Sequence, residues 1–377
     1  MDLASAKVVA DRLRADAADR DRANRRPVEE VELLRGSRLL AVPPDDHVTT
    51  HAVTRIVAAA DPSIGHLLGY HYLHLWRAGL FGNPEAAARM RRRTAEQGLF
   101  WAGVSSPPNP ADAGLKMTTV DGGFRVNGRR TFVTGAAVAD RLVASARDGS
   151  GEIRTFLVDA RAPGIGHPDD WDNTGQRLSA SGSIVFDGVH VDANDVLGSP
   201  PSGDVRISLT SLAFQAILAQ ICVAIAEGAL AEAADYTRRH ARPWLLSGAA
   251  AAAEDPYVLA GYGELVAGVR AAGLLADHGT AALQDAADRG AELTAEQRGA
   301  AAATISAAKI VATRTVNETT ARIFEFLGAR ATAGSFGFDR FWRNARTLTL
   351  HDPVVYKARE LGAHYLTGEP PEPTAYS

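Results

Sequence analysis

Two helical stretches flank a region of short alternating runs, and this pattern divides the chain into three parts. Residues 1–97 are predicted to be helical. Asp61-Pro62 is a typical helix start, because Asp is a favoured N-cap and Pro is tolerated at the first helical position. It precedes the apolar segment 63–82. The next helix-forming segment, 83–98, ends on Gly98, a suitable residue for a helix C-terminus.

Residues 98–200 carry short apolar runs separated by turn residues, which is typical of strands. The runs 124–126 and 131–134 flank Asn127-Gly128, a dipeptide favoured in two-residue hairpin turns. Further candidate strands lie at 140–147, 153–160 and 182–191. Short strands with turns at close intervals predict a small antiparallel sheet or barrel and argue against a parallel α/β fold.

Residues 201–377 return to helical periods. Helices are predicted at about 205–239, at about 256–289 and from about 294, where Thr294 and Gln297 have the spacing of a capping box. One buried stripe on the third helix comprises Ile305, Ala308, Ala312, Val316, Ile323 and Phe326. The predicted fold class is α+β with several domains: an N-terminal helical domain (1–97), a central antiparallel β domain (98–200) and a C-terminal helical bundle (201–377).

Composition narrows the class of protein. The 377 residues are 46% hydrophobic and 22% charged, with a formal net charge of −4 and no block of five like charges, so neither a nucleic-acid partner nor a polybasic membrane patch is expected. The apolar stretch 212–234 contains Gln215, Gln220 and Glu227, which favours a buried helix over a membrane span. The single cysteine, Cys222, excludes intrachain disulfides and fits a reducing cytoplasm.

Common catalytic motifs are absent: there is no GxxxxGK[ST] loop, no HExxH and no GxGxxG after a strand. Three local clusters remain. His71 and His74 share a helix face, but no carboxylate nearby completes a metal site, and one histidine facing a cleft beside a packed one is favoured. The expected hairpin end Phe132-Val133-Thr134-Gly135, together with the segment 171–177, suits a flat ring ligand or a simple hydrophobic corner. His351, before Asp352-Pro353, suits proton transfer at a cleft edge or a packing role.

Two longer segments resemble a known family. With the helix–sheet–helix order, WDNTGQRLSASGSIVFDGVHV (171–191) resembles the acyl-CoA dehydrogenase superfamily over almost the whole chain. The ending GARATAGSFGFDRFWRNARTLTLHDPVVYKARELGAHYLTG (328–368) resembles its flavin-dependent monooxygenase branch, which contains dibenzothiophene monooxygenase and hydroxylases of amines and amino sugars. The Glu-Gly-Thr context that supplies the base of true acyl-CoA dehydrogenases is absent, and Thr349-Leu350-His351-Asp352-Pro353 stands in its place.

The resemblance implies an acyl-CoA dehydrogenase-like fold that ends in a four-helix bundle, and a two-component monooxygenase. Reduced FMN from a separate NAD(P)H-dependent reductase would react with O2 to a C4a-hydroperoxyflavin, which would oxygenate a small substrate at S, N or aromatic C. The residues that the resemblance assigns are His351 and His71 as the acid/base pair, Thr134 at flavin N5, Trp171 against the ring, and Arg330 and Arg242 at the FMN phosphate. In the last role, His240 and Arg238 are alternatives to Arg242, within a stretch expected from a neighbouring subunit.

The resemblance further implies a homotetramer. The single cysteine favours the cytoplasm, and the lack of ligand motifs predicts no bound metal. The main alternative is an FAD-dependent dehydrogenase that acts on the CH–CH bond of an acyl thioester, with Asp352 or Glu360 as an unrecognised base. A third alternative is a binding or scaffold protein that has lost its flavin, because a fold alone does not fix a function.

Overall fold

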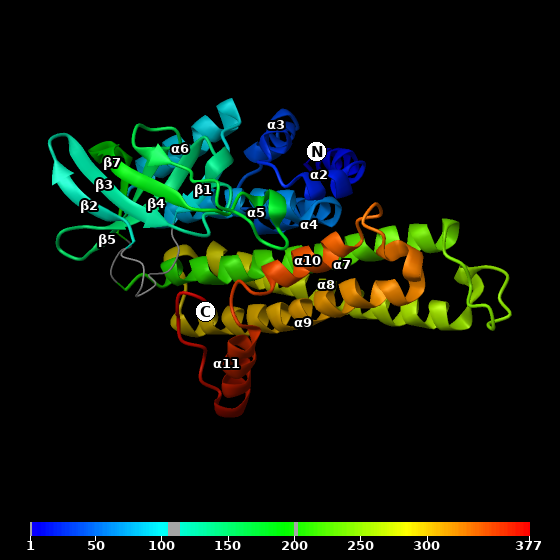
Figure 1. Ribbon diagram of the computed structural model, residues 1–377. Helices are drawn as coiled ribbons and strands as arrows, with labels where there is room; N and C mark the ends of the chain where they lie inside the picture. The colour runs from blue at the N-terminus through cyan, green and yellow to red at the C-terminus, as the bar shows by residue number, and fades with distance from the viewer. Residues whose placement is uncertain (1, 105–113, 200–202) are drawn as a thin grey trace.

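Three groups of elements follow one another in the computed structural model, which describes residues 2–104, 114–199 and 203–377 (Figure 1). The first group is helical: α1 (Asp2–Arg14), α2 (Ala17–Ala23), α3 (Val28–Gly36), α4 (His47–Ala60), α5 (Pro62–Arg77) and α6 (Pro84–Gln97). The second is a sheet: β1 (Trp101–Val104), β2 (Lys116–Val120), β3 (Gly123–Arg130), β4 (Arg141–Arg147), β5 (Ile153–Asp159), β6 (Ile165–Gly166), β7 (Ile184–Asp192) and β8 (Val196–Gly198). The third comprises α7 (Leu209–Arg239), α8 (Pro256–Asp288), α9 (Ala295–Leu327), α10 (Asp339–Leu348) and α11 (Val354–Thr367). This order confirms the predicted α+β class.

The sheet differs from the prediction in two respects. Its order is β6-β7-β3-β2-β4-β5-β8, and β1 also pairs with β4. Two pairs, β1–β4 and β2–β4, are parallel, so the sheet is mixed rather than antiparallel. Asn127-Gly128 is not a hairpin turn either: β3 runs through it, with a shift in register between Val126 and Gly128. A Cβ on Gly128 would lie 2.3 Å from the backbone oxygen of Gly114, so this glycine permits a close backbone approach.

The long helices begin and end close to their predicted positions. Thr294 and Gln297 form both bonds of the capping box at the start of α9. Cys222 is fully buried on α7, and burial raises the pKa of its thiol to about 11, as suits an inert residue. Two helical segments, 205–239 and 256–288, are long and apolar enough to span a membrane. The most apolar window of the first is 89% buried in the bundle, like that of a core helix, and the window of the second is 28% buried.

Helix α5 is enclosed on every side, since all 16 of its residues are buried. Two glycines on one face make this possible. A Cβ on Gly65 would lie 2.3 Å from the Cβ of Ala58 on α4, and one on Gly69 would lie 2.8 Å from Ile217 on α7. Helix α5 also packs on β1, so it lies where the helices, the sheet and the bundle meet (Figure 1).

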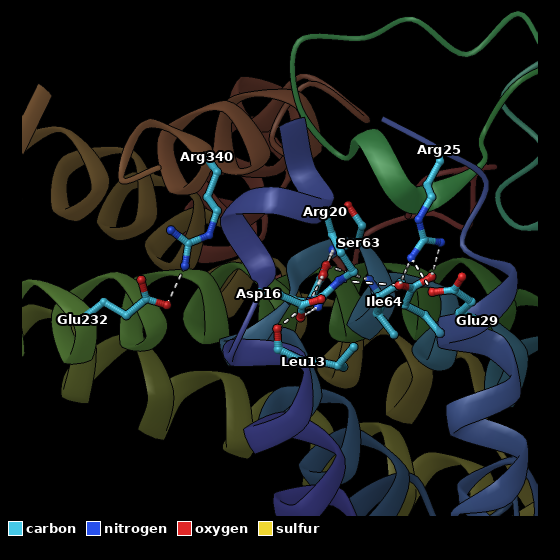
Figure 2. A network of polar contacts seen from close by, with 11 residues as sticks. Leu13, Asp16, Arg20, Arg25, Glu29, Ser63, Ile64, Glu232 and Arg340 are labelled. Carbon is cyan, nitrogen blue, oxygen red and sulfur yellow. Dashed lines mark hydrogen bonds and ion pairs between the residues drawn. The ribbon is translucent and has the colours of Figure 1, made fainter. Parts of the chain in front are cut away.

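A buried ion pair holds the start of α5. Asp61, the N-cap, accepts hydrogen bonds from the backbone N–H groups of Ser63 and Ile64 through Oδ1. Its Oδ2 accepts a bond of 2.9 Å from Arg20, which also bonds Asp16 and the backbone oxygen of Leu13 (Figure 2). Burial opposes the charge of Arg20, but Asp61 and Asp16 outweigh it and raise the pKa of the guanidinium.

Two arginines fix α10 against the rest of the molecule. Arg340 forms an ion pair with Glu232 on α7 (Figure 2). Arg343 forms one with Asp21 on α2 and donates a bond of 3.0 Å to the backbone oxygen of Thr174. Helix α10 is therefore tied to the bundle, to the N-terminal helices and to the loop before β7.

Replacing Asp61 with Ala should lower the free energy of unfolding by about 3 kcal/mol, because it leaves Arg20 buried with fewer counter-charges and removes the cap of α5. Asp61→Asn, which can still cap the helix, should cost less. Urea denaturation followed by circular dichroism measures both changes. The control is Asp11→Ala, which removes an exposed pair with Arg14 and should leave stability nearly unchanged. Equal losses for Asp61→Ala and Asp11→Ala would contradict the role of the pair.

Candidate active site

A cavity of about 1090 Å³ lies where α5, the sheet region and the bundle meet. Its lining comes from seven parts of the chain: α5, β1 at Gly103, the end of β3 with the loop that follows, the segment 171–181, α7, the region from α10 to His351, and residues 375–376. Such a volume suits a flat cofactor with a small substrate beside it.

Hydroxyl groups line the sheet side of the cavity in a hydrogen-bonded chain. The hydroxyl of Thr134 lies 2.9 Å from that of Ser181, which lies 2.7 Å from the hydroxyl of Ser179. Ser179 in turn donates to the backbone oxygen of Gln176 at 2.7 Å, and the indole N–H of Trp171 donates to the same oxygen at 2.8 Å. One short segment thus supplies both an aromatic plane and oriented hydroxyls.

The backbone of this wall is held in unusual conformations. Phe132, Gln176 and Ala180 have φ angles of 55°, 54° and 45°, in the left-handed region that side chains disfavour. The N–H of Gln176 donates to Asn344 on α10 at 2.5 Å, and a Cβ on Gly175 would lie 2.0 Å from the backbone oxygen of Arg343. The close contact with α10 therefore fixes the strained segment, as is common where a site is built.

Three polar residues of α5 line the opposite wall: His66, Tyr70 and His74, spaced four residues apart on one helix face. His66 donates through Nδ1 to Gln176 Oε1 at 3.1 Å, which links the two walls. Burial lowers the pKa of His66 to about 3, so this imidazole is neutral at pH 7. A Cβ on Gly103 would lie 2.0 Å from the ring of His74, so that strand position must be glycine.

His351 belongs to a charged relay at the bundle side of the cavity. Its Nδ1 donates to Asp352 Oδ1 at 3.0 Å, and the ammonium group of Lys309 lies 3.8 Å from the same oxygen. Burial acts to raise the pKa of Asp352, but the bond from His351 and the charge of Lys309 outweigh it and lower that pKa to about 2. An ionised Asp352 keeps hydrogen on Nδ1, so Nε2 is the ring nitrogen left for the cavity.

Of the residues that the resemblance assigned to the site, the structure brings three to this cavity, namely Thr134, Trp171 and His351. His71 is not among its lining residues. Nε2 of His71 donates to the backbone oxygen of Leu40, and its Nδ1 accepts from the N–H of Trp101. The ring is fully buried with both nitrogens occupied. Of the pair His71 and His74, one was predicted to face a cleft and the other to pack beside it. The residue that lines the cavity is His74, not His71 as the resemblance implied.

The two expected phosphate ligands lie elsewhere. Arg242 follows α7 and Arg330 follows α9, at the end of the bundle away from the sheet (Figure 1). Both are exposed, and neither lines the cavity. The centroid of the Tyr236 ring lies 5.1 Å from that of Phe336 and 5.4 Å from that of Phe338. These contacts join the end of α7 to the segment that follows α9.

The comparisons with known proteins agree with this geometry. The family "Acyl-CoA dehydrogenase, middle domain" matches residues 109–189, and "Acyl-CoA dehydrogenase, C-terminal domain" matches 216–355. A probable FMNH2-dependent monooxygenase, SfnC of Pseudomonas putida, is 37% identical over the whole chain and 97% of its own length. The dibenzothiophene monooxygenase of Rhodococcus erythropolis is 37% identical over 98% of this chain and 94% of its own. The structure of FMN-bound TdsC from Paenibacillus sp. A11-2 has a TM-score of 0.94, with 38% identity and full coverage of both chains.

The chain belongs to the acyl-CoA dehydrogenase family, in its flavin-dependent monooxygenase branch. This membership confirms both the resemblance and the fold that it implied.

The residues of this family member fit a flavin. Trp171 and Phe132 supply aromatic surface, and the hydroxyl chain from Thr134 supplies polar partners for a ring edge. In the described part of the chain, Gln176 Nε2 and His66 Nε2 are buried without a hydrogen-bond partner, so the same wall has unused hydrogen-bonding capacity.

The sequence contained a signal for the residues to which the resemblance assigned no role. His66, Tyr70 and His74 recur every four residues, a helical spacing that groups them on one face. Lys309 is a charge within an Ala-rich apolar stripe, which indicates a buried partner.

Acid should destabilise the protein through its buried histidines. Burial lowers the pKa of five of them: His47, His51, His66, His71 and His74. An unfolded histidine binds a proton below about pH 6.5, whereas folded His71 does so only at about 4. Stability should therefore fall as pH drops from 6.5 towards 4, by up to about 1.4 kcal/mol per pH unit for each such histidine.

Urea denaturation at pH 7.5, 6.5 and 5.5 measures this slope. His71→Asn should reduce the slope of the unfolding free energy against pH by the contribution of one titrating histidine, up to about 1.4 kcal/mol per pH unit. The matched control, His278→Asn, removes an exposed histidine of α8 outside the buried group. An unchanged slope in His71→Asn would contradict the neutral state of that ring.

Proposed function

We propose that the protein is a two-component monooxygenase that uses reduced FMN and O2 to oxygenate a small organic substrate at sulfur, nitrogen or aromatic carbon. The observation that carries the proposal is the His351–Asp352–Lys309 relay opposite neutral His66 at one cavity. Relatives of full length that carry the name of FMNH2-dependent or dibenzothiophene monooxygenase support it.

Reduced FMN supplies the electrons that activate O2, so that one oxygen atom enters the substrate and the other leaves as water. Thr134 and Trp171 hold the ring edge and the ring face. His351 exchanges protons through Nε2 while Asp352 accepts the hydrogen bond from Nδ1 and holds the orientation of the ring. Burial lowers the pKa of His66 and raises the pKa of Tyr70. Both side chains therefore remain uncharged hydrogen-bonding groups beside the substrate. This assignment gives His66 the place that the resemblance gave to His71.

The dehydrogenase alternative has less support from the positions of its candidate bases. Asp352 is engaged by His351 and Lys309 and does not line the cavity. Glu360 bonds Lys357 and the hydroxyl of Ser377 under the segment that follows α11. An α-proton would therefore lack a free carboxylate acceptor at either position.

The assembly that we propose is a cytoplasmic homotetramer supplied with reduced FMN by a separate reductase. Large exposed apolar side chains on the bundle support contacts between subunits: Trp244, Leu245, Leu246, Leu274, Tyr365 and Leu366. Arg242 and Arg330 lie away from the cavity of their own chain, which supports their binding the FMN phosphate of a partner subunit.

A coupled assay tests the function. The protein, a flavin reductase, NADH, FMN and 18O2 are incubated with a panel of a sulfide, an amine and an indole, and the mass of the products is measured. Incorporation of one 18O atom is expected. If acyl-CoA instead bleaches tightly bound FAD, the protein is a dehydrogenase. If titration detects binding of neither flavin, the protein is a non-catalytic relative.

His351→Ala should lower oxygenation by about 10²-fold or more, since general acid–base catalysis contributes on that scale. FMN affinity, measured by equilibrium titration, should change little. His278→Ala on the exposed face of α8 is the matched control and should retain the rate. Full turnover by His351→Ala would remove this residue from catalysis.

Mixing two impaired variants tests the arginines in trans. Arg330→Ala and Arg242→Ala should each weaken FMN binding by about tenfold or more, because bonds to charged groups contribute about 1.5–3 kcal/mol. Hybrids of Arg330→Ala with His351→Ala subunits should regain activity, since one site would combine the intact His351 of the first subunit with the intact Arg330 of the second. The exposed Arg270→Ala variant controls for loss of surface charge. Hybrids that stay inactive would indicate that the arginines act within one chain.

A further inference from the structure

The segment 369–377 returns from the end of α11 to the bundle (Figure 1). Pro370 contacts α9 at Gly299, where a Cβ would lie 2.2 Å from the proline Cβ. Arg298, the neighbouring residue, donates to the backbone oxygen of Pro371 at 3.3 Å. Helix α9 therefore contacts the segment in two ways: Gly299 leaves room for Pro370, and Arg298 donates a hydrogen bond to Pro371.

The last residue of this segment is held in a polar cage. Ser377 is only 2% exposed, although most residues before it are exposed. Its backbone oxygen accepts from Ser211 at 2.8 Å and from Arg298, and its hydroxyl accepts from Lys357 at 2.9 Å. The cage draws on α7, α9 and α11, so it fixes the segment relative to three helices at once.

The cage contains two buried cationic side chains, Arg298 and Lys357. Arg298 is 1% exposed and Lys357 is 2% exposed. Burial lowers the pKa of Arg298 to about 10 against the charge of Glu360, and its hydrogen bonds go to oxygens of Ser208, Pro371 and Ser377. Buried cations are retained where they have partners, and here the segment supplies several of them.

The cage places Tyr376 at the active site. Ala375 and Tyr376 line the cavity, and the ring of Tyr376 meets the ring of His351 edge to face at 6.2 Å. Tyr376 is 40% exposed, so it stands at the boundary between the cavity and solvent. A turn closed by the Thr374–Ser377 backbone bond of 3.0 Å connects the anchored residue to the ring.

We propose that Tyr376 is a substrate-positioning residue, a side wall of the cavity that shields His351 from solvent and is held there by the cage around Ser377. The inference rests on the proposed function, in which His351 exchanges protons with bound reactants. An aromatic wall at that point excludes water from His351 and offers a surface on which an apolar part of the substrate packs.

Chemical labelling tests the wall without any substrate. Diethyl pyrocarbonate modifies accessible imidazoles, and peptide mass spectrometry gives the rate at His351. In Tyr376→Ala this rate should rise about threefold, because only 34% of the His351 side chain is exposed with the ring in place. Tyr376→Phe should match the wild type. Ser377→Ala, which loses the hydroxyl held by Lys357, should raise the rate as Tyr376→Ala does.

The matched control is Tyr365→Ala, which removes an exposed tyrosine of α11 and should leave the labelling unchanged. In the coupled assay, Tyr376→Ala should raise KM about tenfold, as the loss of an aromatic contact implies, with a smaller change in kcat and more hydrogen peroxide per product. An unchanged labelling rate in Tyr376→Ala would overturn the proposal. If labelling rises but the wild type incorporates no 18O, the wall stands and the proposed function fails.

Discussion

Asp61 carries the constraint on which the cavity depends, because one carboxylate both starts α5 and balances a buried arginine. Helix α5 is enclosed on every side, so water cannot satisfy its first N–H groups or the charge of Arg20. Asp61 meets both needs with its two oxygens. By fixing the first turn of α5, Asp61 acts with the close contacts of Gly65 and Gly69 to place His66, Tyr70 and His74 at the cavity.

Local signals were sufficient to predict the helices, whereas the histidine of the site required the tertiary structure. Asp61-Pro62 and the capping box at Thr294 act within one turn, so their sequence spacing fixes them. A helix buried all round has no polar face to show which side meets a cavity. His71 and His74 were therefore equivalent from sequence, and only the packing of Trp101 and Leu40 against His71 separates them.

Long-range contacts explain the other differences. Asn127-Gly128 has the residues of a hairpin turn, yet it lies inside β3. There Gly128 is needed because the backbone of Gly114 approaches it closely. The place of Tyr376 at the cavity could not be predicted from the sequence, because it depends on a cage assembled from α7, α9 and α11. Arg242 and Arg330 were named by resemblance alone, and a single chain leaves them exposed and apart from the cavity. Sequence predicts such residues only where their partners are near in the chain.

His66 and His351, two of the three histidines that line the cavity, have different surroundings, which divides the proton chemistry between them. Burial is the largest influence on the pKa of His66, and the charge of Lys309 acts in the same direction, so the ring stays uncharged. His351 is partly exposed, and its Nδ1 donates to Asp352, a carboxylate whose pKa is lowered to about 2. Lys309 keeps that carboxylate ionised from the far side. Neighbouring groups with opposed environments can thus serve as hydrogen-bonding partner and proton carrier at one pH, which an oxygenation that releases water requires.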